Sequence, residues 1–191
     1  MFSVLRVVAL VLFAMTTSSL QARTIDINLS SDAAQFKYAS LVGATTFGRT
    51  EMGFGFLYNE DDNLLGEISL LVIDEAGTKS PGLELGVGPK LYLADPDIPG
   101  VDFVAIGLGG QMRYKNPQAP RIVYGVGLFY APSITAFGDA DSMYEFDMRL
   151  EYELLPTANI YVGYRSIEAD IKNRPDVEVD QSAVIGLRFK F

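Results

Sequence analysis

The last ten residues of the chain alternate strictly between two kinds of side chain. One parity is apolar and holds Ala183, Ile185, Leu187, Phe189 and Phe191, while the other holds Ser182, Val184, Gly186, Arg188 and Lys190. Successive side chains of a β-strand point to opposite faces, so this period of two predicts a strand with one apolar and one mostly polar face. Each face must therefore meet a different environment.

The same alternation continues through nearly the whole chain and predicts an all-β fold. It is cleanest over residues 144–154, where tyrosine, phenylalanine, methionine and leucine alternate with charged residues. No segment sustains the 3.6-residue period of a helix. The pattern gives about ten strands of roughly the 9–11 residues that a tilted membrane strand needs. The first two strands are the most weakly patterned, and without them the count is eight.

The first 22 residues have the pattern of a cleaved signal peptide. Arg6 precedes an apolar run over 7–15, and small or polar residues lead to Ala22, after which cleavage is expected. An apolar run of this length is too short for a membrane-spanning helix, which needs about 20 residues. We therefore expect export, with a signal peptide at 1–22 and one β-barrel domain at 23–191.

Composition excludes several classes of function. The net charge of -9 disfavours a nucleic-acid partner, which requires a basic surface. The chain has no cysteine and no histidine, so it has no disulfides, no thiolate chemistry and no imidazole base. Glu151 and Glu153 form a carboxylate pair without a nucleophile nearby, and Ser133 and Ser142 have no histidine to activate them. We expect no catalytic residues, no enzyme activity, no metal and no cofactor.

The two faces can be assigned to two different architectures. A soluble, periplasmic, lipocalin-like barrel would turn the apolar face inward to bind an apolar ligand. A transmembrane antiparallel up-and-down barrel in the cell outer membrane would turn it toward lipid. Three features favour the membrane barrel: the aromatic carboxy terminus, the strand glycines on the polar face, and aromatic residues of the apolar face near strand ends. These aromatic residues of the apolar face are Tyr58, Tyr114, Tyr130, Tyr144, Tyr152, Tyr164, Phe189 and Phe191.

With the polar face inward, the lumen is expected to contain two sets of residues. The first is a glycine lane formed by Gly53, Gly55, Gly86, Gly88, Gly107, Gly109, Gly125 and Gly127. The second is a charge network formed by Glu145, Asp147, Arg149, Glu151, Glu153, Arg165, Arg188 and Lys190. The network either pairs internally and holds the barrel shut, or forms the wall of a narrow polar pathway along the glycines. The function is thus structural or that of a porin-like channel for small solutes.

The expected surroundings follow from a membrane location. The partners would be outer-membrane lipid, lipopolysaccharide and the barrel-assembly machinery, with Phe189 and Phe191 as the terminus that directs membrane insertion. We expect a monomer. If the carboxy terminus is periplasmic, the connectors at 59–63, 94–100, 132–142 and 171–177 lie outside the cell.

Four short motifs resemble the YfaZ family of bacterial outer-membrane proteins. They are Asn28-Leu29-Ser30, the run Tyr58 to Asn63, Phe129-Tyr130-Ala131-Pro132-Ser133, and the stretch from Leu154 to Arg165. Together they extend over nearly the whole mature chain. The resemblance implies an outer-membrane location, but it implies no particular activity and transfers no catalytic or binding residue.

Overall fold

The computed structural model describes residues 23–46, 48–77, 80–96, 99, 101–172, 175 and 177–191. The expected signal peptide at 1–22 lies outside them. The strands are β1 (Arg23–Leu29), β2 (Ala33–Thr45), β3 (Gly48–Asn59), β4 (Leu64–Glu75), β5 (Leu83–Asp95), β6 (Phe103–Lys115), β7 (Ile122–Ala131), β8 (Ala136–Gly138), β9 (Ala140–Leu155), β10 (Ala158–Ile171) and β11 (Val177–Lys190). No helix in this part of the chain is long and apolar enough to cross a bilayer.

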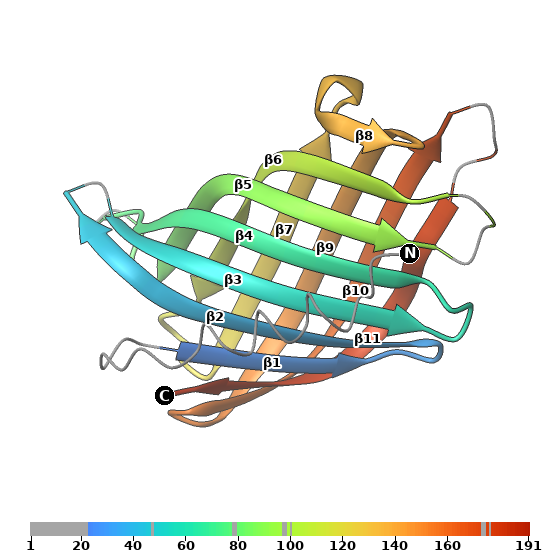
Figure 1. The fold of residues 1–191 in the computed structure, drawn as a ribbon. Helices are drawn as coiled ribbons and strands as arrows, with labels where there is room; N and C mark the ends of the chain where they lie inside the picture. Colours follow the sequence, from blue (N-terminus) through green and yellow to red (C-terminus); the bar gives the residue numbers. More distant parts are fainter. Residues whose placement is uncertain are drawn as a thin grey trace.

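All strands but one form a closed antiparallel barrel (Figure 1). Apart from β8, each strand pairs with the strand before it and the strand after it, with β7 joined directly to β9, and β1 pairs with β11, so the described strands leave no open seam. Without the short β8, the ring contains ten strands. The predicted all-β, up-and-down barrel is therefore confirmed, with ten strands rather than eight.

Strand β8 extends the wall beyond the end of β7. β7 pairs with the second half of β6, from Leu108 to Lys115, and ends at Ala131. β8 pairs with the first half of β6, where Phe103 lies opposite Gly138. The sequence pattern predicts a loop over 132–142, and the structure contains a 3₁₀ turn (Ser133–Thr135) and β8 in this segment. Strand β8 has only three residues, which are too few to display a period of two.

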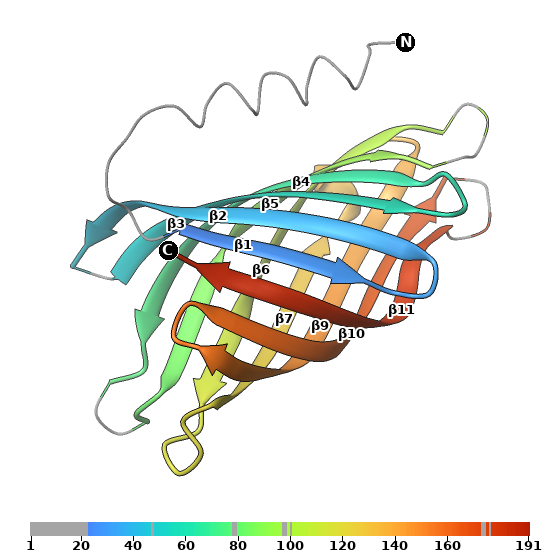
Figure 2. The ribbon, with the colours of Figure 1, turned by 90° about the horizontal axis from the view of Figure 1, so that it is seen from below.

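The two ends of the barrel carry different connections, which Figure 2 shows from below. The carboxy terminus and the start of β1 lie at the end that we call the turn end, together with the connections 46–47, 76–82, 116–121 and 156–157. The opposite end, the loop end, carries the connections 30–32, 60–63, 96–102, 132–139 and 172–176. This arrangement agrees with the directions expected from the alternation.

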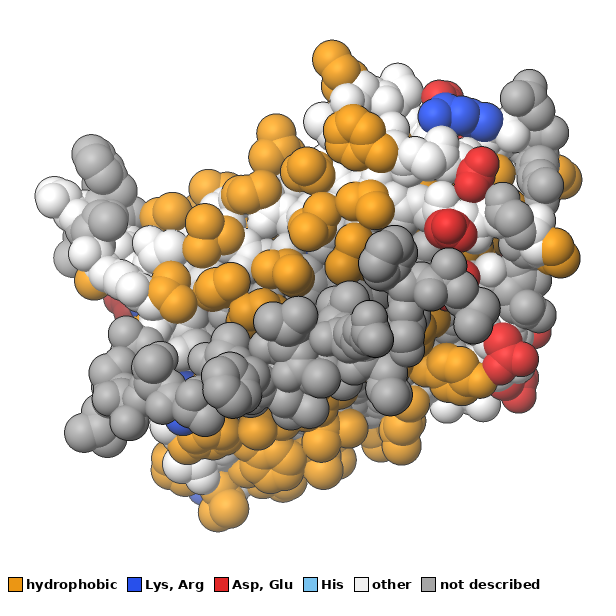
Figure 3. Space-filling model, viewed as in Figure 1, with side chains coloured by type: hydrophobic (Ala, Val, Ile, Leu, Met, Phe, Trp, Pro, Cys, Tyr) orange, Lys and Arg blue, Asp and Glu red, His pale blue; other side chains and the backbone are white. Residues whose placement is uncertain are grey.

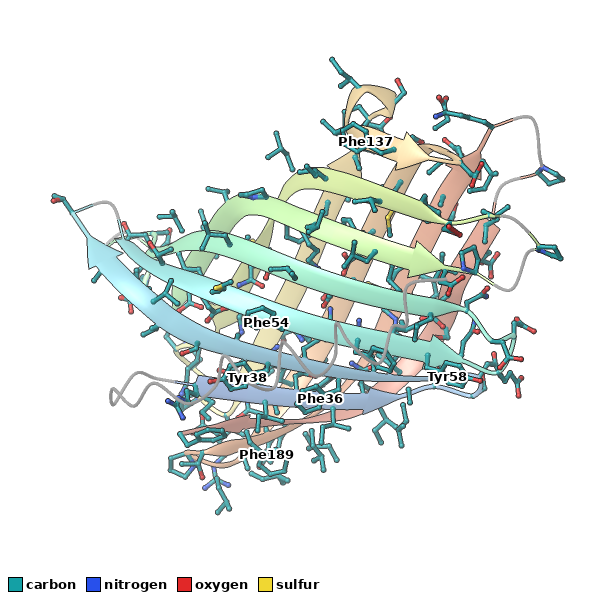
Figure 4. All side chains as sticks on the ribbon, viewed as in Figure 1. Phe36, Tyr38, Phe54, Tyr58, Phe137 and Phe189 are labelled. Carbon is teal, nitrogen blue, oxygen red and sulfur yellow. The ribbon has the colours of Figure 1, made fainter. Side chains whose placement is uncertain are left out.

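The outer wall is apolar. Exposed side chains on the outer face include Ile27, Leu70, Leu108, Met148 and Ile185. Figure 3 shows hydrophobic side chains spread over the visible wall, with acidic side chains gathered toward the loop end. In Figure 4, the labelled aromatic residues of β2 and β3 lie along this wall. An apolar outer face around a charged interior rules out the lipocalin-like alternative, in which the two faces would be reversed.

Tyrosines form two bands on this wall. Near the loop end, Tyr130 on β7 lies opposite Tyr144 on β9. Near the turn end, the rings of Tyr114 and Tyr124 stack with centroids 6.4 Å apart, and Tyr152 lies on the next strand. Tyr144 and Tyr152 are eight residues apart on β9, which corresponds to about 26 Å along an extended strand and to roughly 20 Å of height at a strand tilt of about 40°. Aromatic girdles around an apolar band of about 25 Å are the surface of an outer-membrane barrel.

Candidate functional site: the lumen

The lumen consists of two halves that differ in chemistry. At the loop end it is filled by a cluster of buried apolar side chains, and toward the turn end it contains a charged cavity. The two halves are built by the same strands, because the inward residues of each strand change from apolar to charged along its length.

We call the loop-end cluster the apolar layer. It comprises Leu57, Leu65, Tyr92, Ala94, Val101, Phe103, Ala105, Phe129, Ala131, Ala136, Ala140, Met143, Ile167, Ala169, Ile171, Val177 and Val179. Leu57, Ala105 and Ile167 have no exposed surface, and Met143 is only 1% exposed. Interiors of this kind pack as densely as organic crystals and exclude water. Within the described part of the chain, the apolar layer therefore closes most of the loop end of the lumen.

The cavity has a volume of about 660 Å³. Its lining extends from Phe129, a member of the apolar layer, and Lys90, beneath that layer, to Arg23, Lys190 and Phe191 at the turn end. The buried apolar cluster also includes Leu71 and Ile73, farther along β4 toward the turn end, and these two residues line the cavity together with Phe129. The cavity thus reaches the turn end and stops where the apolar layer begins.

Two carboxylates organise the turn-end part of the charge network. Glu151 has no exposed surface and pairs with Arg188 at 2.9 Å, with Arg113 at 3.1 Å and with Arg149 at 3.3 Å. Asp26 pairs with Arg188 at 2.8 Å and with Arg149 at 3.3 Å. We call these five residues the Glu151 cluster. Sharing two carboxylates among three guanidinium groups compensates the desolvation that each charge would otherwise suffer.

The carboxylates of the Glu151 cluster also have neutral hydrogen-bond donors. Asn159 donates from Nδ2 to Glu151 at 2.7 Å, and the hydroxyl of Tyr161 donates to Asp26. Such donors satisfy lone pairs that the arginines do not reach.

A second cluster lies directly beneath the apolar layer. Lys90 is held between Glu145 at 2.9 Å and Glu67 at 3.1 Å, and Lys37 pairs with the same two carboxylates. The hydroxyl of Tyr92 donates to Glu145 at 2.5 Å. We call these five residues the Glu145 cluster. The ammonium of Lys90 also lies 4.5 Å from the centre of the Phe129 ring, so a cation–π contact joins this cluster to the apolar layer.

Arg165 belongs to neither cluster. Its guanidinium pairs with Asp180 and donates to Asn28 at 2.6 Å and to Gln35 at 2.7 Å. All four residues are buried, and none of them lines the cavity. This group fills the lumen beside the apolar layer, between β1, β2, β10 and β11.

Three glycines of the expected lane, Gly55, Gly125 and Gly127, lie beneath charged side chains of neighbouring strands. A Cβ atom on Gly55 would overlap the carboxylate of Glu67, one on Gly127 would overlap Asp147, and one on Gly125 would come within 2.9 Å of Arg149. Gly109 differs, because a Cβ there would overlap the backbone of β7 at Leu128. These positions accommodate large neighbours on a crowded concave surface, as expected for glycine in a curved sheet.

The predicted charge network divides among several places. Glu145, Arg149, Glu151 and Arg188 belong to the two clusters described above, while Arg165 pairs elsewhere. Glu153 pairs with Lys115 at 2.9 Å at the turn end. Asp147 and Lys190 line the cavity. The predicted insertion terminus lies at the turn end, where the backbone of Phe191 pairs with that of Arg23.

Five charged residues of these clusters are absent from the network predicted from the sequence. They are Asp26, Lys37, Glu67, Lys90 and Arg113. On these strands the inward charges are isolated or few and stand among glycines and neutral residues, so no run of charges marks them. The polar parity itself is the available signal, because it places every one of them in the lumen.

No group of three or more potential metal ligands occurs among the described residues. The site is thus a set of paired charges around a cavity.

Comparison with known proteins gives one family and several distant structures. No curated protein sequence is significantly similar to this chain. Among solved structures, the KdgM porin superposes with a TM-score of 0.46 and 10% identity, covering 89% of this chain and 99% of the porin. The outer membrane channel DcaP of Acinetobacter baumannii gives a TM-score of 0.44 and 13% identity over 87% of this chain and 54% of the channel. The outer membrane protein Omp33 of Acinetobacter baumannii gives a TM-score of 0.35 and 9% identity over 90% of this chain and 96% of that protein.

The family assignment comes from the sequence. A family model described as "YfaZ precursor" matches residues 2–191, which is nearly the whole chain and agrees with the resemblance of the four motifs. The chain is a member of the YfaZ family.

Proposed function

We propose that this protein is a non-enzymatic, porin-like barrel for small solutes, and that the apolar layer closes its pathway in the resting state. The observation that carries the proposal is the cavity of about 660 Å³, which reaches the turn end and stops at Phe129. A polar cavity of this size holds many water molecules, and a water-filled space that opens at one end of the barrel is consistent with a solute pathway.

A closed resting state is also consistent with the strand number. A barrel of about ten strands has little more interior than side chains can fill, and open aqueous channels occur in barrels with many more strands. Passage would therefore require the apolar layer to rearrange. Buried aliphatic side chains from opposite walls, such as Leu57 on β3 and Met143 on β9, form this barrier.

The absence of histidine and cysteine supports the non-enzymatic part of the proposal, since the usual general base and thiolate nucleophile are missing. The lipid-facing wall supports outer-membrane lipid as the surroundings. We also propose that the protein is a monomer and that its partners are lipopolysaccharide and the barrel-assembly machinery.

Conductance in planar bilayers tests it. We expect the unmodified protein to give small or rare currents, and the double variant Leu57→Ser/Met143→Ser to give larger and longer ones. Serine is smaller than leucine or methionine, and its hydroxyl group hydrogen-bonds water in the space that the two substitutions open within the apolar layer. The double variant Leu70→Ser/Met148→Ser changes the outer wall in the same way and serves as the control, for which we expect no increase. Equal currents from all three proteins, or none from any of them, would contradict the proposal.

A further inference from the structure

The lining of the cavity is cationic, although the chain as a whole carries a charge of -9. Among the described residues, its cationic side chains are Arg23, Lys37, Arg49, Lys90, Arg113, Arg149, Arg188 and Lys190. Its acidic side chains are Asp26, Glu51, Glu67, Glu84 and Asp147. Glu145 and Glu151 lie behind the cations rather than at the cavity surface, so the surface itself carries eight cationic and five acidic side chains.

The excess is concentrated in the Glu151 cluster. Three arginines, Arg113, Arg149 and Arg188, share Glu151 and Asp26. Outside the cluster, Arg113 pairs with Glu84 at 3.8 Å, and Asp147 lies close enough to Arg149 for electrostatic attraction. The Nε atom of Arg113 is buried and has no hydrogen-bond partner among the described residues, and the buried Nε atom of Arg149 lies 3.3 Å from Glu151 without hydrogen-bond geometry. The internal carboxylates thus leave the guanidinium groups incompletely paired, which is unusual for buried donors.

Lys190 adds a fourth cation to this region. It lines the cavity at the turn end, close enough to Arg113 and Arg188, and also to Glu151 and Glu153, for electrostatic interaction. None of the described carboxylates forms an ion pair with it within 4.0 Å. A cation that faces a cavity, has no ion-pair partner and lies beside other cations attracts a mobile anion.

We propose that the turn-end part of the cavity binds small multivalent oxyanions, carrying carboxylate or phosphate groups, at Arg113, Arg149, Arg188 and Lys190. This inference rests on the proposed function, since it names the solute class of the same cavity. Guanidinium groups suit these ligands because their planar array of donors matches the oxygens of carboxylate and phosphate. A volume of about 660 Å³ lies within the range of small-molecule sites, roughly 300–1,000 Å³.

Calorimetric titration of the folded barrel in a zwitterionic detergent tests the inference without requiring conduction. The probes are citrate for the carboxylate source, tripolyphosphate for the phosphate source, and spermidine as a cation of comparable charge. We expect binding of at least one anion, no binding of spermidine, and an affinity that falls as salt is added, because exposed charges are screened.

Lys190→Gln is the informative variant because it removes no partner from an internal carboxylate. We expect the anion affinity to fall about fivefold, which is the loss of roughly 1 kcal/mol. Lys115→Gln is the matched control: Lys115 is the same residue type near the same end, pairs with Glu153 and lies outside the cavity lining. It should leave the affinity unchanged. Heat-modifiable gel migration of each variant confirms that the barrel is folded.

The outcomes separate this inference from the proposed function. Tight binding of spermidine, no binding of either anion, or an unchanged affinity in Lys190→Gln would overturn the anion site. Anion binding by a protein that never conducts, even as Leu57→Ser/Met143→Ser, would overturn the proposed function while leaving the site in place.

Discussion

Arg188, on the last strand, donates two hydrogen bonds to the same carboxylate oxygen of Asp26, on the first strand, at 3.0 and 2.8 Å. The two residues are direct partners in the β1–β11 register, which is the pairing that closes the barrel across the chain termini. The ion pair thus joins the ends of the chain from inside the lumen. The sequence alone does not predict this ion pair, since its two residues are 162 positions apart.

This pair predicts that Asp26→Asn will be strongly destabilising. The amide keeps the shape of Asp26 but removes the charge that Arg149 and Arg188 share, and breaking a buried pair costs about 3–5 kcal/mol. Urea unfolding in lipid vesicles measures the loss. Glu153→Gln, which breaks the half-exposed pair with Lys115, should cost less than about 1 kcal/mol. Equal losses in both variants would refute the role assigned to Asp26.

The Glu145 cluster predicts non-additive behaviour. Glu145→Gln leaves Lys37 and Lys90 competing for Glu67, and Lys90→Met leaves two carboxylates with Lys37 alone. The double variant retains the Lys37–Glu67 pair and nothing unmatched. We therefore expect it to be more stable than the sum of the two single changes implies, by about 0.5–3 kcal/mol, as measured in a double-mutant cycle of unfolding free energies. Strict additivity would show that the cluster does not act as a unit.

The glycine positions should differ in how well they tolerate a methyl group. At Gly109 a Cβ would overlap the backbone of β7, which cannot move aside, so Gly109→Ala should cost about 1–3 kcal/mol. At Gly43 no atom lies within 4 Å of the same Cβ, so Gly43→Ala is the control and should be close to neutral. The folded fraction on heat-modifiable gels across a urea series measures both. A neutral Gly109→Ala would contradict the close approach of β6 to β7 at this position.

The lipid-facing wall predicts a cost that depends on depth. Met148 lies midway between Tyr144 and Tyr152 and is 48% exposed, so Met148→Arg should destabilise the barrel in vesicles by about 2–4 kcal/mol. Leu154, at the turn end of the same strand and on the same face, is 51% exposed, and Leu154→Arg should cost no more than about 1 kcal/mol. Urea unfolding of both variants in vesicles measures the difference. A barrel surrounded by water would tolerate both changes alike.

The sequence was sufficient to predict the barrel, the strand directions and the face of each strand, because a strict alternation records which side chains meet lipid. The apolar layer was not predicted, for a physical reason. Near the loop end both parities are apolar, as at Phe56, Leu57 and Tyr58 or at Leu64 and Leu65, so alternation no longer distinguishes the lumen from the outer wall. The partner choices of Arg188 and Arg165 likewise depend on register between distant strands, which one sequence does not display.

The central claim is that the charged cavity communicates with the turn end and is closed toward the loop end. The chain has no cysteine, so single cysteines can report on access without background. Ser69→Cys places a thiol in the cavity lining, and Ser31→Cys places one in an exposed loop-end connection as the control. Both variants are expressed in cells without general porins and treated with a sulfonated, membrane-impermeant maleimide.

We predict that Ser31→Cys is labelled in intact cells, whereas Ser69→Cys is labelled only after the outer membrane has been permeabilised so that the reagent reaches the periplasm. Labelling of Ser69→Cys in intact cells, at the rate of Ser31→Cys, would contradict the account, since the cavity would then be open to the cell exterior.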